Sequence, residues 1–232
     1  MLRLFKSEGR ERIRVALLTT AVLSFVACGG ATREKVYDEA EAPGGAQVKR
    51  GVKPEADAEA VVLEVESGGF SYGRVVIELY PNVAPKMVER FKRLVGEGFY
   101  DGTAFHRVSV GGGVVQGGDP NSRDEDPSND GAGESSYEDV PAEFSDIPFD
   151  RGIVGAARTK QGPDTANSQF YLTLRRVPQW DAQYTVFGKV IDGMSNADAI
   201  AGAPTRPAPY DQSPVDKIVI KRATLQPRAS FK

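Results

Sequence analysis

The stretch AVVLEVESGGFSYGRVVIELY, residues 60–80, decides the fold class of this 232-residue chain. It contains two runs rich in β-branched residues, separated by residues 67–73, which include three glycines. β-branched side chains favour strands, and a short glycine-containing segment between two such runs is typical of a hairpin. Residues 60–80 therefore predict two antiparallel strands at the start of a β-rich domain.

The sequence after this hairpin predicts two helices among many short strands. Residues 84–96 place Met87, Phe91 and Leu94 on one helical face, and a second helical window spans residues 194–201. The remaining apolar runs are short and interrupted by Gly and Pro, at residues 105–110, 114–115, 152–157, 169–174, 184–191 and 215–225. This pattern favours a mainly β fold, a closed antiparallel barrel, over a parallel α/β sheet.

The N-terminus resembles a bacterial lipoprotein signal. Five basic residues lie within residues 1–14, and the 13 residues 15–27 carry no charge. Such a segment is shorter than the roughly 17–25 residues that a membrane-spanning helix needs, which favours a secretory signal peptide. Cys28, the only cysteine, follows directly, as in a lipobox whose cysteine is lipidated. An ordinary cleaved signal and an uncleaved anchor are the alternatives.

These features predict four segments. We expect residues 1–27 to be the signal peptide, 28–58 a flexible tether, 59–226 the folded domain and 227–232 a tail. The tether is rich in Gly, Ala, Glu, Lys and Pro, and it cannot bury enough apolar area to offset its chain entropy. Gly29 stands where many Gram-negative bacteria use aspartate to retain lipoproteins in the inner membrane. We therefore expect a lipid on Cys28 to anchor the domain to the outer membrane, facing the periplasm.

Composition argues against several classes of function. The five basic and two acidic residues of 1–27 leave 24 basic and 30 acidic residues, a net charge of −6, which disfavours nucleic acid as a partner. One cysteine cannot form a disulfide within the chain, and a single histidine leaves no zinc cluster. Residues 126–131 resemble the start of a calcium-binding loop, but Tyr137 stands where that loop needs a glutamate. We expect neither a metal nor a cofactor.

The most chemically specific region runs from His106 to Gln116. Arg107 follows the only histidine, and Gln116 is followed by two glycines that would let a ligand backbone lie close. Gln169 supplies a second amide at the start of another apolar run. Taken alone, His106 and Arg107 could be a core histidine and a solvated arginine. The neighbouring amides instead favour a polar binding site.

Four longer motifs carry a family resemblance. They are GFYDGTAFHRV (98–108), QGGDP (116–120), SQFY (168–171) and QYTVFGKV (183–190). Several matches in the right order are more specific than any one of them. Together they resemble the cyclophilin family of peptidyl-prolyl cis-trans isomerases, from about Ala60 to Leu225. The resemblance implies an eight-stranded antiparallel barrel capped by two helices, and an enzyme that accelerates rotation about X-Pro bonds in folding proteins.

The resemblance also implies roles for the polar residues. Arg107 would donate a hydrogen bond to the prolyl nitrogen as the bond twists. Gln116 would bind the substrate backbone and orient Arg107, and His106 would line the site. Gln169 would be a second substrate-contacting amide.

Other positions match the family's substrate contacts. Four match the walls of a proline pocket, with ordinary core packing as the alternative: Val114, Tyr171, Trp180 and Tyr184. Ala157 and Arg158 match contacts to the residues before the proline. Gly113 stands where the family has a bulky phenylalanine on the pocket floor, and the spacing from Arg107 to Gln116 is one residue longer. We expect Trp180, in place of a family leucine, to fill this gap.

The leading interpretation is a monomeric, lipid-anchored isomerase whose substrates are proline-containing polypeptides. The alternative is a cyclophilin-like module that binds proline segments with little or no turnover. Gly113 and the changed loop lengths motivate this alternative.

Overall fold

The computed structural model describes residues 47–231. The predicted signal peptide, the candidate lipidation site at Cys28 and most of the predicted tether lie outside the described residues. Within the described part, none of the helices has both the length and the apolar character needed to cross a bilayer.

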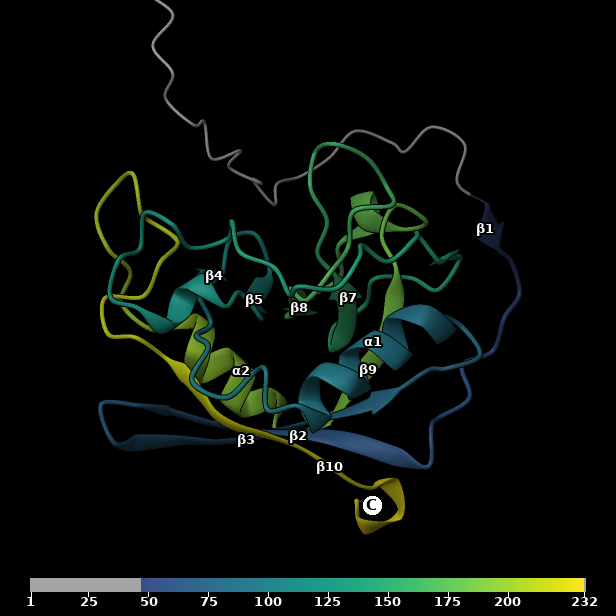
Figure 1. Cartoon of the computed structure of the whole chain (residues 1–232), viewed down its shortest axis with the longest axis horizontal. Helices are drawn as coiled ribbons and strands as arrows, with labels where there is room; N and C mark the ends of the chain where they lie inside the picture. Colours follow the sequence, from purple (N-terminus) through teal and green to yellow (C-terminus); the bar gives the residue numbers. More distant parts are fainter. Residues whose placement is uncertain (1–46, 232) are drawn as a thin grey trace, which may run out of the picture. The chain divides into compact units, whose positions relative to one another are not determined.

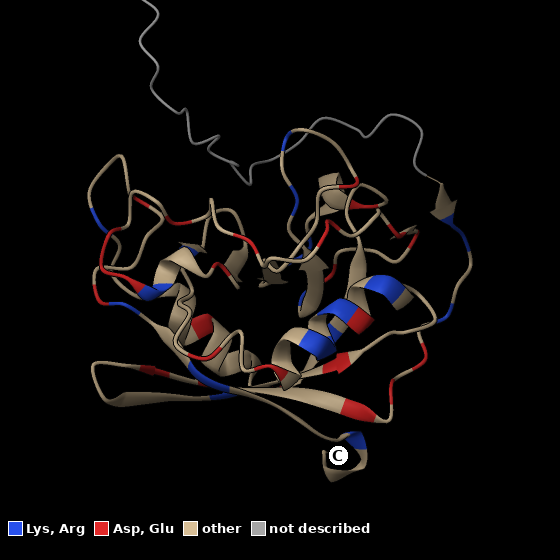
Figure 2. Cartoon of the chain, in the orientation of Figure 1, with Lys and Arg blue, Asp and Glu red and all other residues tan. Residues whose placement is uncertain are grey.

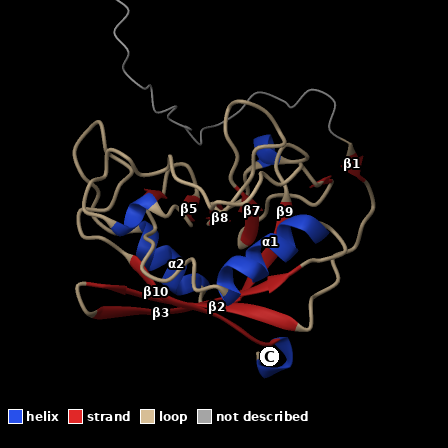
Figure 3. Cartoon of the chain, viewed as in Figure 1, coloured by secondary structure: helices blue, strands red, loops and turns tan. Residues whose placement is uncertain are grey.

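An eight-stranded sheet forms the scaffold, and every ladder in it is antiparallel (Figures 1 and 3). Its order is β10-β2-β3-β9-β7-β8-β5-β4. The strands are β2 (Glu59–Ser67), β3 (Phe70–Leu79), β4 (Arg107–Ser109), β5 (Val114–Gly117), β7 (Ile153–Ala156), β8 (Phe170–Thr173), β9 (Val186–Asp192) and β10 (Val219–Pro227). The predicted hairpin is confirmed as β2 and β3. Its turn contains Gly68 and Gly69, both with positive φ, a conformation that glycine adopts without steric cost.

The prediction of a closed barrel is wrong, because no ladder among residues 47–231 joins the edge strands β4 and β10. The chain just before β4 instead contacts the start of β10. Gly102 N donates to Ile220 O, and Phe105 N to Ile218 O, each at 2.8 Å. Gly102 lies in a turn with φ +78°, and β4 has only three residues, so this edge offers an isolated bridge at Ala104 rather than a continuous strand. The result is an open half-barrel.

The two predicted helices are confirmed as α1 (Pro85–Gly96) and α2 (Met194–Ala201). Figure 1 shows both between β2, β3 and β10 on one side and β4, β5, β7 and β8 on the other. Their apolar faces pack in the main core, where the Phe91 ring lies 5.2 Å from that of Phe170 and 5.1 Å from that of Phe187. The outward face of α1 carries basic residues (Figure 2). Helix α1 thus shows the apolar and polar faces expected of an amphipathic helix.

Shorter elements complete the described part. A parallel pair joins β1 (Val48–Lys49) to β6 (Phe144–Ser145). Single 3₁₀ turns lie at Asn121–Arg123, Pro178–Trp180 and Arg228–Ser230.

Alternation along the short strands creates a second apolar cluster. In β5, Val115 packs in the main core and Val114 packs in the second cluster. In β8, Leu172 packs in the main core and Tyr171 packs in the second cluster. Successive residues of a strand point to opposite faces, so Val114 and Tyr171 share the face that carries Gln116. This face holds the candidate site.

Candidate active site

Arg107 is the first residue of β4, directly opposite Gln116 of β5. Its Nε donates to Gln212 Oε1 at 2.6 Å, and its Nη1 lies 3.4 Å from Gln116 Oε1. The side chain is partly exposed. Within the described part, Nη2 donates no hydrogen bond. The guanidinium is therefore held on two sides and keeps one free donor group.

Gln116 and Gln169 form an amide relay behind Arg107. Gln116 Nε2 donates to Gln169 Oε1 at 3.0 Å. Gln169 Nε2 in turn donates to the carbonyl oxygens of Gly131 at 3.1 Å and Gly133 at 2.8 Å. Both glutamines are buried. Because an amide nitrogen can only donate here, the chain of bonds fixes both amides and directs Gln116 Oε1 toward Arg107.

The two glycines after Gln116 serve internal packing. A Cβ at Gly117 would lie 3.1 Å from Ala104 O, and one at Gly118 only 2.6 Å from Ser168 O. The expectation that these glycines let a ligand backbone approach is therefore wrong. Protein backbone already occupies the space beside them.

His106 is buried against the back of this site. Burial, and then the positive charge of Arg107, lower the pKa of its imidazole to about 4. The backbone of Ala104 opposes this shift of the pKa, but neither ring nitrogen forms a hydrogen bond of good geometry with another described residue. The ring instead lines a small cavity with Asp130, Pro214 and Lys217. With this pKa the imidazole is uncharged at neutral pH and only weakly basic, which suits a lining residue better than a general base.

Four rings form what we call the aromatic cluster: Phe149, Tyr171, Trp180 and Tyr184. The ring centroids of Tyr171 and Trp180 lie 5.0 Å apart, and those of Trp180 and Tyr184 5.5 Å apart. Val114 belongs to the same apolar cluster. All four predicted pocket positions thus come together beside the amide relay, since Tyr171 pairs with Gln116 in the sheet. Their low exposure, 1–7%, shows that they also pack closely on one another.

Gly113 is covered by Arg175. A Cβ at Gly113 would lie 2.7 Å from Arg175 Cγ, and the Arg175 guanidinium donates to Gly111 O. Gly113 also has φ +77°, a backbone conformation that disfavours other residues. The arginine stem therefore occupies the space beside Gly113, while Trp180 packs within the aromatic cluster. Compensation by Trp180 stays a prediction.

Ala157 and Arg158 follow β7 and lie next to both the amide relay and the aromatic cluster. Ala157 N donates to Gln169 O at 3.0 Å. Arg158 is 4% exposed, and its Cζ lies 4.6 Å from the centroid of the Tyr184 ring. The sheet thus places Arg158 between the backbone of the amide relay and the aromatic cluster.

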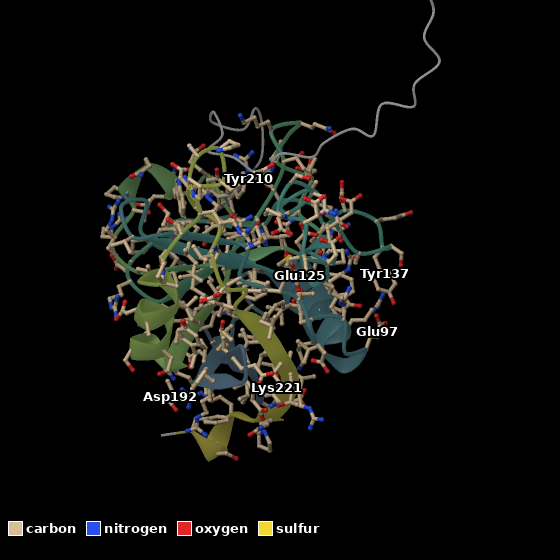
Figure 4. The ribbon with its side chains drawn as sticks, turned by 90° about the vertical axis from the view of Figure 1, so that its left-hand side faces the viewer. Glu97, Glu125, Tyr137, Asp192, Tyr210 and Lys221 are labelled. Carbon is tan, nitrogen blue, oxygen red and sulfur yellow. The ribbon has the colours of Figure 1, made fainter. Side chains whose placement is uncertain are left out.

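The sequence did not point to Phe149, Arg175 or Gln212. Gln212 lies in a loop, residues 203–217, with four prolines and no apolar periodicity, so nothing in the pattern marks it. Tyr210 of this loop lies at the end of the described part opposite Lys221 and Asp192 (Figure 4). The loop nevertheless reaches the site, where Gln212 O also accepts a 2.7 Å hydrogen bond from Val108 N.

Several known proteins are similar to this chain. A probable peptidyl-prolyl cis-trans isomerase of Brucella suis biovar 1 (strain 1330) is 46% identical over 150 residues, 62% of this chain and 73% of that protein. A peptidyl-prolyl cis-trans isomerase of Schizosaccharomyces pombe (strain 972 / ATCC 24843) is 40% identical over 129 residues, 54% of this chain and 77% of its own.

Among solved structures, a cyclophilin-type peptidyl-prolyl cis-trans isomerase of Cryptosporidium parvum, determined in the presence of the dipeptide Ala-Pro, matches with a TM-score of 0.61. It is 29% identical, and the match covers 72% of this chain and 98% of that one. The family model described as "Cyclophilin type peptidyl-prolyl cis-trans isomerase/CLD" matches residues 61–225. Fold, motifs and relatives agree, and the chain belongs to the cyclophilin-type peptidyl-prolyl cis-trans isomerase family.

Proposed function

We propose that Arg107 carries the isomerase activity by donating a hydrogen bond to the prolyl nitrogen of a bound X-Pro segment. The observation that carries this proposal is the double anchoring of its guanidinium, by Gln212 at Nε and Gln116 at Nη1, with Nη2 left to meet a substrate. A donor held in place before the reaction needs no reorganisation when the transition state forms.

The chemistry requires little else. Amide resonance gives rotation a barrier of roughly 18–20 kcal/mol. Twisting the bond removes that resonance, and the prolyl nitrogen becomes pyramidal and basic. A hydrogen bond to this nitrogen is therefore stronger in the twisted state than in the planar one, which lowers the barrier selectively.

Gln116 has a second task in this mechanism. Its Nε2 carries two hydrogens, and one of them is used on Gln169. The other is suited to a substrate carbonyl oxygen next to the prolyl bond. Val114 and the aromatic cluster, on the same face, offer the apolar surface against which the proline ring would pack.

An assay of the unmodified protein separates turnover from simple binding. NMR exchange on an Ala-Pro peptide measures the rate of cis-trans interconversion directly. We expect the protein to accelerate exchange at substoichiometric concentration. Saturable binding with exchange left at its uncatalysed rate would instead support the alternative of a proline-binding module.

Gln212 offers a test of how Arg107 is held. Gln212→Ala removes the acceptor at Arg107 Nε but leaves its backbone carbonyl bonded to Val108. We expect kcat to fall about three- to tenfold, as a net hydrogen bond of ~0.5–1.5 kcal/mol implies, with KM changing less. Gln212→Glu keeps an acceptor and should restore most of kcat. Gln226→Ala on β10 is the control, and an unchanged kcat in Gln212→Ala would show that the loop does not position Arg107.

We also propose that the protein is lipid-anchored through Cys28, at the outer membrane and facing the periplasm. The uncharged residues 15–27 after a basic segment, followed at once by the only cysteine and then by Gly29, support this placement. Labelling with a fatty-acid analogue in bacterial cells tests it. We expect label in the native chain and none in Cys28→Ser, and an unlabelled native chain would overturn the anchor.

A further inference from the structure

Arg158 is a buried cation without an anionic partner among the described residues. It is 4% exposed, and within that part of the chain it forms no salt bridge. Its Nε and Nη2 both point to one acceptor, the carbonyl oxygen of Gln183, and both distances are long at 3.4 Å. A guanidinium has five N–H donors, so most of its capacity is unused.

The groups around Arg158 provide little compensation for its charge. Its guanidinium lies over the Tyr184 ring, 4.6 Å from the centroid, which gives a cation-π contact. The hydroxyl of Tyr171 is buried and has no hydrogen-bond partner within residues 47–231. The charge of Arg158 reaches this hydroxyl, since it opposes the rise in the Tyr171 pKa that burial causes. A cation with only long hydrogen bonds and a hydroxyl with no partner among the described residues therefore lie close together.

Asp181, two residues before Gln183 in the chain, is already engaged elsewhere. It pairs with Arg176 and accepts a hydrogen bond from Phe149 N. A buried charge is costly unless it is paired and hydrogen-bonded. An arriving carboxylate would supply the partner that the described residues do not provide.

The position of Arg158 indicates where such a carboxylate would sit. Ala157 N is bonded to Gln169 O, and Gln169 is bonded to Gln116 beside Arg107. In the proposed mechanism Arg107 and Gln116 hold the prolyl bond. Arg158 directly follows Ala157, the residue that contacts Gln169, and it lies between this contact and the aromatic cluster. We propose that Arg158 binds the side-chain carboxylate of the residue before proline, so that Glu-Pro and Asp-Pro segments are preferred substrates. This inference rests on the proposed function of Arg107 and Gln116.

Two peptides that differ in one charge test the inference with the full chain. They are Ala-Glu-Pro and Ala-Gln-Pro peptides, which have nearly the same shape, and the quantity measured is kcat/KM by NMR exchange. We expect the native protein to favour the Glu peptide by about tenfold or more, since hydrogen bonds to charged groups are worth more than neutral ones. Equal values for the two peptides would overturn the proposal without any variant.

Substitution assigns the preference to one side chain. Arg158→Met keeps a long apolar stem but removes the charge, so the ratio of kcat/KM for the Glu peptide to that for the Gln peptide should fall toward one. Arg158→Lys keeps the charge and should retain part of this preference. Arg151→Met, which removes an equal charge from an exposed pair with Asp198, is the matched control and should leave the ratio unchanged. A ratio that survives in Arg158→Met would overturn the assignment.

The test also separates this inference from the isomerase mechanism. If the native protein turned over neither peptide, the proposed function would fail. NMR titration would then compare the binding of the two peptides. Tighter binding of the Glu peptide, lost in Arg158→Met, would still support carboxylate recognition, and equal binding would overturn it.

Discussion

Arg107→Ala is expected to lower kcat/KM for an Ala-Pro peptide by about 10²–10³, the range found when one transition-state hydrogen-bond donor is removed. The donor acts on the prolyl nitrogen only as the bond twists, so kcat should carry most of the loss. NMR exchange measured at saturating and at subsaturating peptide concentrations gives kcat and kcat/KM separately.

Stability measurements keep this result interpretable. Arg107 is partly exposed and forms no salt bridge in the described part, so the thermal midpoint of Arg107→Ala should stay close to that of the native protein. Arg74→Ala, which removes a similar arginine of β3 from its pair with Asp192 of β9, is the control and should retain full activity. Retained turnover in a folded Arg107→Ala protein would contradict the mechanism.

Gly155→Ala is expected to damage both stability and activity. A Cβ at Gly155 would lie 2.5 Å from the Tyr171 hydroxyl oxygen, a distance that real Cβ atoms do not tolerate. Tyr171 must then move within the aromatic cluster. Overpacking of this kind costs typically ~1–3 kcal/mol, and Tyr171 pairs with Gln116, so the displacement reaches the site. We expect a lower unfolding midpoint in urea and a raised KM for proline peptides.

Gly96→Ala provides the matched control for this substitution. Gly96 ends α1, and a Cβ added there would have nothing within 4 Å among the described residues, so alanine fits without strain. Activity should be unchanged. If Gly155→Ala behaved like Gly96→Ala, the Tyr171 ring would not be constrained by the backbone beneath it.

Local patterns made much of the fold predictable. The β-branched runs of residues 60–80 predicted β2 and β3, and the spacing of Met87, Phe91 and Leu94 predicted α1. Each of these elements is determined by residues close together in the sequence, and the periodicity of apolar residues is informative over such short stretches. The same holds for Arg107 and Gln116, which pair in register because β4 and β5 are joined by a short connection.

Other features depend on contacts that no local pattern records. Arg107 and Gln212 are 105 residues apart, and the Gln212 loop has no periodicity. Arg175 reaches Gly113 from the end of β8, so the residue that covers the glycine follows from sheet register. The open edge follows from the contacts between residues 102–105 and β10, which form an isolated bridge at Ala104 rather than a ladder. Tertiary geometry decides all three.

The pairing of β2 with β10 has a consequence for synthesis. β2 begins at Glu59, and its partner ends at Pro227, so one flank of β2 stays open until almost the whole chain has left the ribosome. Contacts between distant segments form slowly because loop closure must precede them. The last pairing of this sheet can therefore form only after β10 has been made. For a protein that is exported before it folds, as we propose, the order of the strands favours a late completion of the fold.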